Sequence, residues 1–243
     1  MGSAASNYFL NCLTADDQRL LAPHLRLVQI EGGQVLHSLG EQIGDVYMPL
    51  SGILSLTLPF HDGRMGELGI AGANTVVGAI AVLRDTEAIH SLTAEVGGRT
   101  YKIATRDLRK CVEQSRTLLD ALRKHEQAQS AQTFQIAACN AVHTLQERLC
   151  RWLLQCRDLL ATTDLPVTQD ILSAMLGVRR PSLTLVAGEL QRAGLIKSRR
   201  GYFEIIDNDG LKDASCECYE AILGQLQRLT GWSPGLNNRD CGE

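Results

Sequence analysis

The pattern of apolar and polar positions changes twice along the chain. Between residues 25 and 104, short apolar runs are separated by glycines, and 12 of the 22 glycines lie between positions 32 and 98. From residue 105 to residue 160 there is neither a glycine nor a proline, and both return beyond that point. This pattern predicts a β-rich segment, then a helical segment, then a third segment of mixed structure.

The β-rich segment contains runs of the length and composition of strands. The predicted strands are VLHSL (35–39), DVYMPL (45–50), GILSLTLPF (52–60), IHSLTAEV (89–96) and RTYKIA (99–104). HDG at 61–63 has the composition of a hairpin turn. Before the strands, residues 14–24 predict a short helix, because Thr14 can cap it and acidic residues follow in its first turn. Many short strands with glycine turns favour a β-sandwich, roll or barrel.

The glycine-free stretch from 105 to 160 predicts two or three helices, one of them long. Its middle, HEQAQSAQTFQ (125–135), carries a weak apolar signal, and a helix this polar needs water or a partner on most faces. A pairing helix in a dimer would fit, although the heptad pattern is broken. Leu145, Leu149, Trp152 and Leu153 then form an apolar stripe that should pack into a second core.

A helix-turn-helix is predicted between residues 168 and 192. Thr168 can cap a first helix, and Gly177 should end it. A second helix should start near Arg180, with Pro181 in its first turn, where the missing N–H costs little. The apolar positions that should face inward on this second helix are Leu183, Val186, Ala187 and Leu190. Two short helices joined by a turn with glycine are typical of DNA-binding proteins.

The outward face of the second helix and the hairpin after it carry positive charge. Arg199, Arg200 and Gly201 predict a tight turn between two short strands, which would form a basic wing. From residue 177 to residue 202 there are six basic side chains and one acidic side chain, a local charge of +5 in a chain of net charge -3. Phosphate affinity needs such a local concentration of charge.

These residues predict contacts to a DNA duplex. One of Arg179 and Arg180 can pair with a guanine while the other holds a phosphate, and Arg180 is preferred for the base. Thr184 and Leu185 can contact bases. The full set of predicted DNA contacts is Arg179, Arg180, Ser182, Thr184, Leu185, Lys197, Arg199 and Arg200. A solvated arginine pair is the alternative, but positive charge at a helix start opposes the helix dipole and is hard to explain by stability alone.

The remaining sequence features argue against membrane, secreted and enzymatic classes of protein. No run approaches about 20 apolar residues, so no membrane span is predicted, and the absence of a secretory signal favours the cytoplasm. The eight cysteines are therefore expected to be thiols and, without CxxC spacing, to act as packing residues. No hydrolase, metalloprotease or phosphate-loop motif is present, so no enzyme, metal or cofactor is predicted. The tail should add a helix from about 209 to 230.

The order of the parts resembles the bacterial Crp/Fnr family of the cyclic-AMP receptor protein and the fumarate–nitrate reduction regulator. The resemblance is carried by GDVYMPLSGILSL (44–56), ERLCRWLL (147–154) and VTQDILSAMLGVRRPSLTLVAGELQRAGLI (167–196). It implies a transcription regulator that binds an inverted repeat of double-stranded DNA as a homodimer. RNA polymerase would be a candidate partner.

The chain departs from the family's two best-known sensor signatures. The stretch that would hold a cyclic nucleotide has Gly78 and Ser91, but Ala79 replaces the glutamate and His90 replaces the arginine of that pattern. In that pattern the glutamate binds the ribose hydroxyl and the arginine binds the cyclic phosphate. Alanine has no carboxylate for the ribose, and histidine lacks the planar charged group that binds a phosphate. These four residues form the predicted effector pocket, and its ligand stays unassigned. The iron–sulfur pattern is also missing, because the N-terminal segment has Cys12 alone.

Together these observations predict an α+β chain in three parts. Residues 1–142 should form a cyclic-nucleotide-binding-like β-roll with a long dimerisation helix, residues 143–214 a winged helix-turn-helix, and residues 215–243 a helical tail. The predicted function is sequence-specific transcription regulation that is not controlled by cyclic AMP. Two alternatives stay open, namely thiol-redox control through cysteines such as Cys139, Cys150, Cys156 or the Cys216–Cys218 pair, and a ligand-binding module that does not bind DNA.

Overall fold

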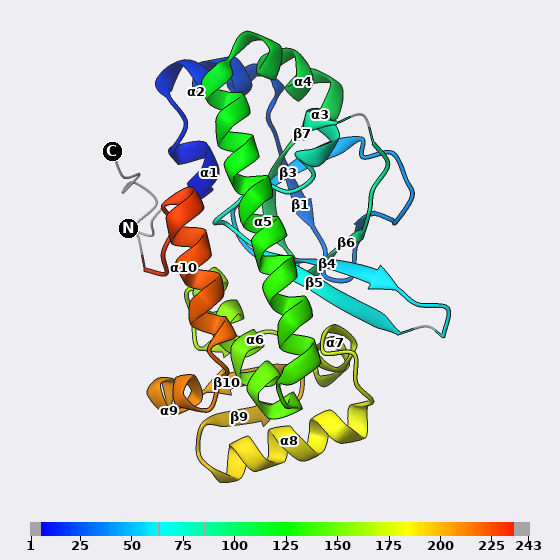
Figure 1. Ribbon diagram of the computed structural model, residues 1–243, viewed down its shortest axis with the longest axis vertical. Helices are drawn as coiled ribbons and strands as arrows, with labels where there is room; N and C mark the ends of the chain where they lie inside the picture. The colour runs from blue at the N-terminus through cyan, green and yellow to red at the C-terminus, as the bar shows by residue number, and fades with distance from the viewer. Residues whose placement is uncertain (1–5, 63, 85, 236–243) are drawn as a thin grey trace.

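A computed structural model describes residues 6–62, 64–84 and 86–235 of the chain (Figure 1). A β-roll lies at one end, a winged helix-turn-helix at the other, and the long helix α5 (Arg116–Val142) runs between them. This α+β arrangement confirms the predicted fold class.

The β-roll consists of two antiparallel sheets with strand orders β1-β7-β3 and β2-β6-β4-β5. Their strands are β1 (Arg26–Ile30), β2 (Val35–His37), β3 (Asp45–Pro49), β4 (Ile53–Pro59), β5 (Met65–Ala71), β6 (Ser91–Val96) and β7 (Gly98–Ala104). Four of the five segments predicted as strands contain β2, β3, β4 and β6, and the fifth, 99–104, covers all of β7 except Gly98. Strands β1 and β5 lie outside the predicted segments. The predicted hairpin turn joins β4 to β5, and its residue 63 lies outside the described residues.

Short helices cover the ends of the roll, and they are α1 (Tyr8–Asn11), α2 (Ala15–Leu21), the 3-10 turn Ala22–His24 and α3 (Ile80–Leu83). Thr14 caps α2 as predicted, because its side chain accepts the backbone N–H of Asp17 at 3.1 Å. The glycine-free stretch forms three helices, α4 (Thr105–Gln114), α5 and α6 (Leu145–Leu160). Only two residues separate α5 from α6, and Thr144 and Glu147 form a capping box at the start of α6.

The winged helix-turn-helix follows α6. Its elements are β8 (Asp164–Leu165), α7 (Gln169–Met175), α8 (Arg180–Arg192), β9 (Ile196–Arg199) and β10 (Tyr202–Ile205), with strand order β8-β10-β9. Thr168 caps α7 by accepting the backbone N–H of Ile171. Gly177 turns the chain with a φ of +65°, a left-handed value that favours glycine. These features confirm the predicted helix boundaries.

The prediction of a single tail helix from about 209 to 230 is wrong in one respect, because the segment forms two helices. These are α9 (Asn208–Asp213) and α10 (Cys218–Thr230), and α10 runs beside α5 (Figure 1). Residues 214–217 form the turn between them, where the side chain of Ser215 donates a hydrogen bond to the carbonyl of Cys216. A serine that bonds its neighbouring backbone competes with helix continuation.

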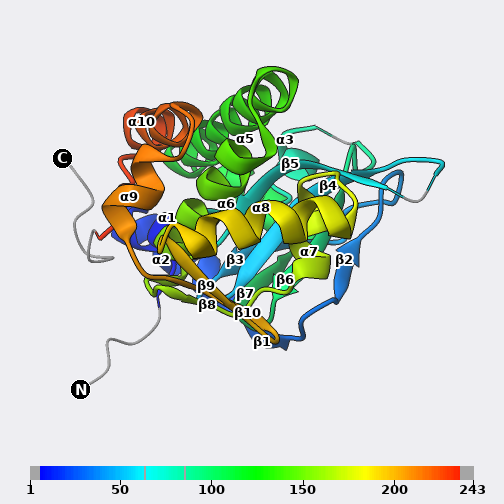
Figure 2. The same ribbon diagram turned by 90° about the horizontal axis from the view of Figure 1, so that it is seen from below.

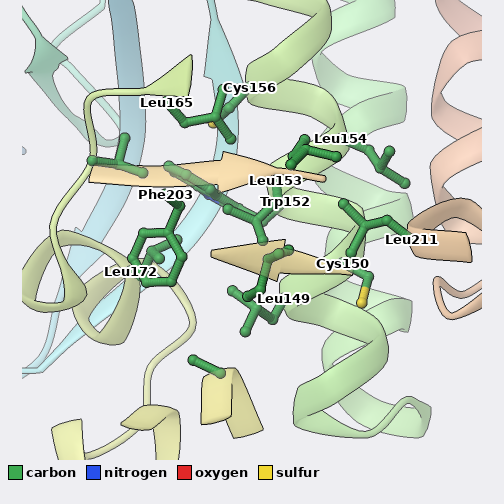
Figure 3. Close-up of a cluster of buried hydrophobic side chains, with 14 of the residues drawn as sticks. Leu149, Cys150, Trp152, Leu153, Leu154, Cys156, Leu165, Leu172, Phe203 and Leu211 are labelled. Carbon is green, nitrogen blue, oxygen red and sulfur yellow. The ribbon is translucent and has the colours of Figure 1, made fainter. Parts of the chain in front are cut away.

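The largest hydrophobic cluster joins the winged helix to the roll. Figure 3 shows Leu149, Trp152 and Leu153 of α6 in this cluster, which confirms most of the predicted apolar stripe, and Leu145 packs against it. Ile53 of β4 and Ile70 of β5 belong to the same cluster. The roll therefore contributes to the core of the winged helix-turn-helix.

A buried ion pair crosses the same boundary. The carboxylate of Glu67 on β5 lies 3.1 Å from the guanidinium of Arg151 on α6, and the two side chains are 1% and 0% exposed. Arg151 also donates a hydrogen bond of 2.5 Å to Gln155. A buried charge is costly without its partner, so this pair holds β5 and α6 in one relative position.

Neutralising one member of the pair should destabilise the fold. We expect Glu67→Gln to lower the free energy of unfolding by about 3 kcal/mol, because it leaves the guanidinium of Arg151 buried without a counter-charge. Asp120→Asn is the matched control, since Asp120 pairs with Arg123 at the exposed surface and should change stability by less than about 0.5 kcal/mol. Urea-induced unfolding measures both. Equal effects of the two substitutions would contradict a structural role for the buried pair.

Candidate DNA-binding surface and effector-type pocket

Helix α8 lies across the outer surface of the winged helix-turn-helix, as Figure 2 shows from below. Its inward side is buried at Leu183, Ala187 and Leu190, and Val186 is partly buried, as the periodicity predicts. The opposite side is exposed at Pro181, Thr184 and Leu185. Leu185 is 62% exposed. An apolar side chain left in water on this face is explained if another molecule covers it.

The two arginines at the start of α8 are both exposed. Arg179 is the N-cap residue, with extended backbone and no capping bond from its side chain. Arg180 lies 3.2 Å from the carboxylate of Asp170 on α7, and both side chains are more than 60% exposed. Exposed pairs contribute little to stability, so this one can exchange for a phosphate or a base.

The hydroxyl of Thr184 connects the two helices of the motif. It donates either to the side-chain oxygen of Gln169 at 2.9 Å or to the carbonyl of Arg180 at 3.0 Å. This leaves its methyl group and an oxygen lone pair for a ligand. Ser182 lies in the first turn of α8 and is exposed.

The wing is a tight hairpin in which Arg200 and Gly201 connect β9 to β10. Gly201 has a φ of +90°, which requires glycine there. Arg199 makes three contacts. Its guanidinium stacks over the ring of Tyr202 and donates a hydrogen bond of 2.5 Å to the hydroxyl of Tyr202. It also lies 3.4 Å from the carboxylate of Glu204. Arg200 and Lys197 are exposed. All the predicted DNA contacts thus lie on α8, at its start or on the wing.

Gly78 and Ala79, two of the residues predicted for an effector pocket, lie just before the short helix α3 of the roll. Gly78 has a φ of +91°, and an added Cβ would lie 3.4 Å from the carbonyl of Asp45, so the position favours glycine. Ala79 is completely buried and begins the short helix α3. Its methyl group offers no hydrogen bond to a ligand.

His90 and Ser91 lie at the start of β6 and are already engaged within the roll. The Nδ1 atom of His90 is 3.2 Å from the carbonyl oxygen of Ser91, and its ring lies 5.4 Å from that of His37. Burial lowers the pKa of His90, so its ring tends to be neutral. The hydroxyl of Ser91 accepts the backbone N–H of Leu39 at 3.1 Å. Gly78, Ala79, His90 and Ser91 therefore provide no positive charge that could bind a phosphate.

A carboxyl group of α5 that the sequence did not single out lies at the start of α3, whose first residue follows Ala79 in the chain. Glu126 accepts a hydrogen bond from the backbone N–H of Ile80, at the start of α3. Burial raises the pKa of Glu126 to about 7, and the hydrogen bond from Ile80 only partly offsets this. An acidic group at this helix start would repel a phosphate when ionised. The polar pattern of residues 125–135 gave no sign that Glu126 points inward.

The cysteines differ in part from the expectation of thiols that act as packing residues. Cys12 is disulfide-bonded, so that expectation is wrong at this position. Free thiols are present at Cys111, Cys139, Cys150, Cys156, Cys216 and Cys218. Three of them gather with His143 at the C-terminal end of α5, apart from the surface of α8. Because these side chains come from positions 139 to 218, no local spacing motif could have revealed the group.

Two domain families match the sequence. The Crp-like helix-turn-helix domain matches residues 147–214, and the cyclic nucleotide-binding domain matches residues 27–115. Among curated protein sequences, none matches this chain significantly. Of the described helices, none has the length and apolarity needed to cross a membrane.

Several solved structures share the fold at low sequence identity. A Crp/Fnr-family regulator of Eubacterium rectale is 18% identical with a TM-score of 0.67, covering 84% of this chain and 95% of its own. The c-di-GMP responsive global regulator of Xanthomonas campestris is 19% identical with a TM-score of 0.66, covering 79% and 99%. A Crp/Fnr-family regulator of Thermus thermophilus is 24% identical with a TM-score of 0.66, covering 78% and 98%.

The partly buried carboxyl of Glu126 should make stability depend on pH. Between the ordinary glutamate pKa of 4.5 and the folded-state pKa of about 7, the folded chain holds a proton that the unfolded chain has lost. Its contribution to stability is therefore lost as pH rises through this window. We expect Glu126→Gln to remove that part of the pH dependence, so its unfolding temperature should fall less than that of the unaltered protein between pH 5 and pH 8.

Glu113→Gln is the control for this measurement, because Glu113 is an exposed glutamate on α4. Its pH dependence should follow that of the unaltered protein. An unchanged pH dependence in Glu126→Gln would show that the carboxyl of Glu126 does not titrate in this window.

Proposed function

Because the chain belongs to the Crp/Fnr family of transcription regulators, we propose that it binds an inverted-repeat operator as a homodimer without control by cyclic AMP. Each subunit would place α8 in the major groove of one half-site, with the wing against the neighbouring backbone. Two-fold symmetry then puts the half-sites about 34 Å apart.

The observation that carries this proposal is the exposed, basic start of α8 beside a basic wing. In a chain of net charge -3 this surface is locally positive, and the family domain covers it. The side chains there suit two tasks, because arginines can bind guanine edges and phosphates, and Leu185 can contact a thymine methyl group. A ligand-binding module without DNA would leave both the charge and the exposed leucine unexplained.

The residue roles within this surface are part of the proposal. Arg180 reads a guanine after releasing Asp170, and Arg179 holds a phosphate. Ser182, Thr184 and Leu185 contact bases or phosphates nearby. On the wing, Lys197, Arg199 and Arg200 contribute phosphate affinity.

The homodimer is proposed to form along α5. One side of this helix is buried against the roll, and α10 covers a second side. A third side is exposed at 3–4 spacing, at Arg123, Gln127, Ser130, Phe134, Ala137 and Ala141. Phe134 is 73% exposed and is followed by small residues. This spacing matches the seam of two paired helices, with its apolar part in the C-terminal half.

Control by something other than cyclic AMP is supported by the pocket. Ala79 lacks a carboxylate, the ring of His90 lies beside His37, and Glu126 occupies the start of α3. The effector stays unassigned.

A regulator of this kind acts where the chromosome is, so we place it in the cytoplasm. We propose that it acts by binding DNA and not by catalysis. The division at residues 142 and 214 and contact with RNA polymerase belong to the same proposal.

Selection from a random duplex library tests the proposal directly. The reduced protein with no added nucleotide should enrich an inverted repeat, and its affinity should fall steeply with rising salt. Within the selected operator, we expect Arg180→Ala to cost about 1–3 kcal/mol per half-site and to relax the preference at one base pair. Arg200→Ala should weaken all duplexes about equally and reduce the salt dependence.

Arg26→Ala is the matched control, because Arg26 is an exposed arginine on the distant strand β1. It should leave affinity unchanged. If no motif is enriched unless cyclic AMP is added, the proposal of cyclic-AMP independence is wrong. If no duplex is retained at any salt concentration, the assignment of α8 as a reading helix is wrong.

Dimer formation can be tested separately at Phe134. We expect Phe134→Glu to convert the dimer to a monomer in sedimentation velocity, because it places two charges together in the apolar half of the seam. Phe60→Glu is the control, since Phe60 is also exposed, at 56%, but follows β4 at the tip of the roll. A dimer that survives Phe134→Glu would place the interface elsewhere.

A further inference from the structure

Four metal-binding side chains gather where the C-terminal end of α5 meets the start of α10. They are Cys139, His143, Cys216 and Cys218, and their ligand atoms all lie within 4.8 Å of one another. We propose that these four residues bind one zinc ion and that the ion fastens the α9–α10 segment to α5. None of the predicted DNA contacts or effector-pocket residues belongs to this group.

The distances within the group fit a tetrahedral site. With bonds of about 2.3 Å to sulfur and about 2.0 Å to nitrogen, a tetrahedral zinc ion holds two sulfurs about 3.8 Å apart and a sulfur and a nitrogen about 3.5 Å apart. The Sγ atoms of Cys139 and Cys216 are separated by 3.5 Å, and Sγ of Cys218 lies 3.6 Å from Nδ1 of His143. Small side-chain adjustments are enough to close both pairs onto one ion.

The imidazole of His143 is oriented for metal binding. Its Nδ1 atom faces the thiols, while its Nε2 atom lies 3.1 Å from the carboxylate of Glu217. A histidine that binds a metal through one nitrogen commonly donates its other N–H to a carboxylate, which fixes the ring and its tautomer. Glu217 lies in the turn between Cys216 and Cys218, so the same short segment provides two ligands and the supporting carboxylate.

Two neighbouring groups would stabilise metal-bound thiolates. Cys139, Cys216 and Cys218 are buried, and the amide of Gln135 donates a hydrogen bond to Sγ of Cys218 at 3.1 Å. The guanidinium of Arg151 interacts electrostatically with Cys139 and Cys216. Positive charge and an N–H donor both stabilise negatively charged sulfur. Thiolate and imidazole ligands select zinc over magnesium or calcium.

Two other uses of these cysteines fit the geometry less well. A disulfide between Cys139 and Cys216 would leave Cys218 and the aligned His143 without a role. An iron–sulfur cluster attaches its protein ligands to separate iron atoms and so holds them farther apart than one ion does. Four ligand atoms within 4.8 Å indicate a single metal centre.

The position of the site gives it a structural consequence. Cys139 and His143 lie on the last turn of α5 and at its C-cap, and Cys216 and Cys218 lie in the turn between α9 and α10 and at the start of α10. The four ligands are brought together by folding alone, because about 70 residues separate the two halves. Metal binding to such a site adds to the stability of the folded state.

The test uses the full chain, reduced, freed of metal with a chelator and then given Zn²⁺ alone. We expect one zinc per chain by elemental analysis after desalting, and a higher unfolding temperature with zinc than without. Co²⁺ in its place should give the visible absorption of tetrahedral thiolate coordination. Cys216→Ser and Cys218→Ser should each reduce the retained zinc from one per chain to none.

Cys111→Ser is the matched control, because Cys111 is another buried free thiol, located on α4. It should retain one zinc. Glu217→Gln changes an exposed side chain and is expected to fold, so it tests the site even if a cysteine variant does not. It should weaken zinc affinity about 10-fold while keeping one zinc per chain.

Four outcomes would overturn the proposal. They are no zinc retained by the unaltered chain, zinc retained equally by Cys216→Ser and Cys111→Ser, a Cys139–Cys216 disulfide in the purified protein, and iron with inorganic sulfide in it. None of these measurements involves DNA, so failure of the zinc site would be distinguishable from failure of the proposed DNA binding.

Discussion

The buried ion pair between Glu67 and Arg151 fixes how the roll and the winged helix-turn-helix lie against each other. Its two charges come from β5 and α6, which belong to different halves of the molecule. Hydrophobic contacts around Ile53 and Ile70 would tolerate small shifts, whereas a buried charge requires its partner at one distance. The direction in which α8 faces relative to α5 therefore depends on this contact, and so does any signal passed from the roll.

Helix α5 is polar along much of its length because the roll and α10 cover two of its sides and a third side is exposed. Buried residues such as Leu118 and Leu122 face the roll, and α10 packs along another side. The remaining side has the 3–4 spacing of a helix pair. Buried positions on two separate sides do not form one amphipathic stripe, which explains why the apolar periodicity of this long helix is weak.

Local signals in the sequence predicted most of the fold. Thr14 and Thr168 marked helix starts, Gly177 and Gly201 marked turns, and the apolar side of α8 followed from spacing alone. These features depend on neighbours within about four residues. The separation of α9 from α10 was missed because a serine side chain, rather than a glycine or proline, accompanies the break.

The candidate sites were predictable only where they are local. The basic start of α8 and the wing could be read from consecutive residues, whereas the carboxyl of Glu126 and the cluster around His143 depend on which segments folding brings together.

Only two residues connect α5 to α6, and this short connection limits how the two ends of the molecule can move. So short a connection leaves α8 little freedom to move relative to α5. In the proposed dimer, the rigid protein would therefore set the distance between the two half-sites, and the duplex would have to deform to match it.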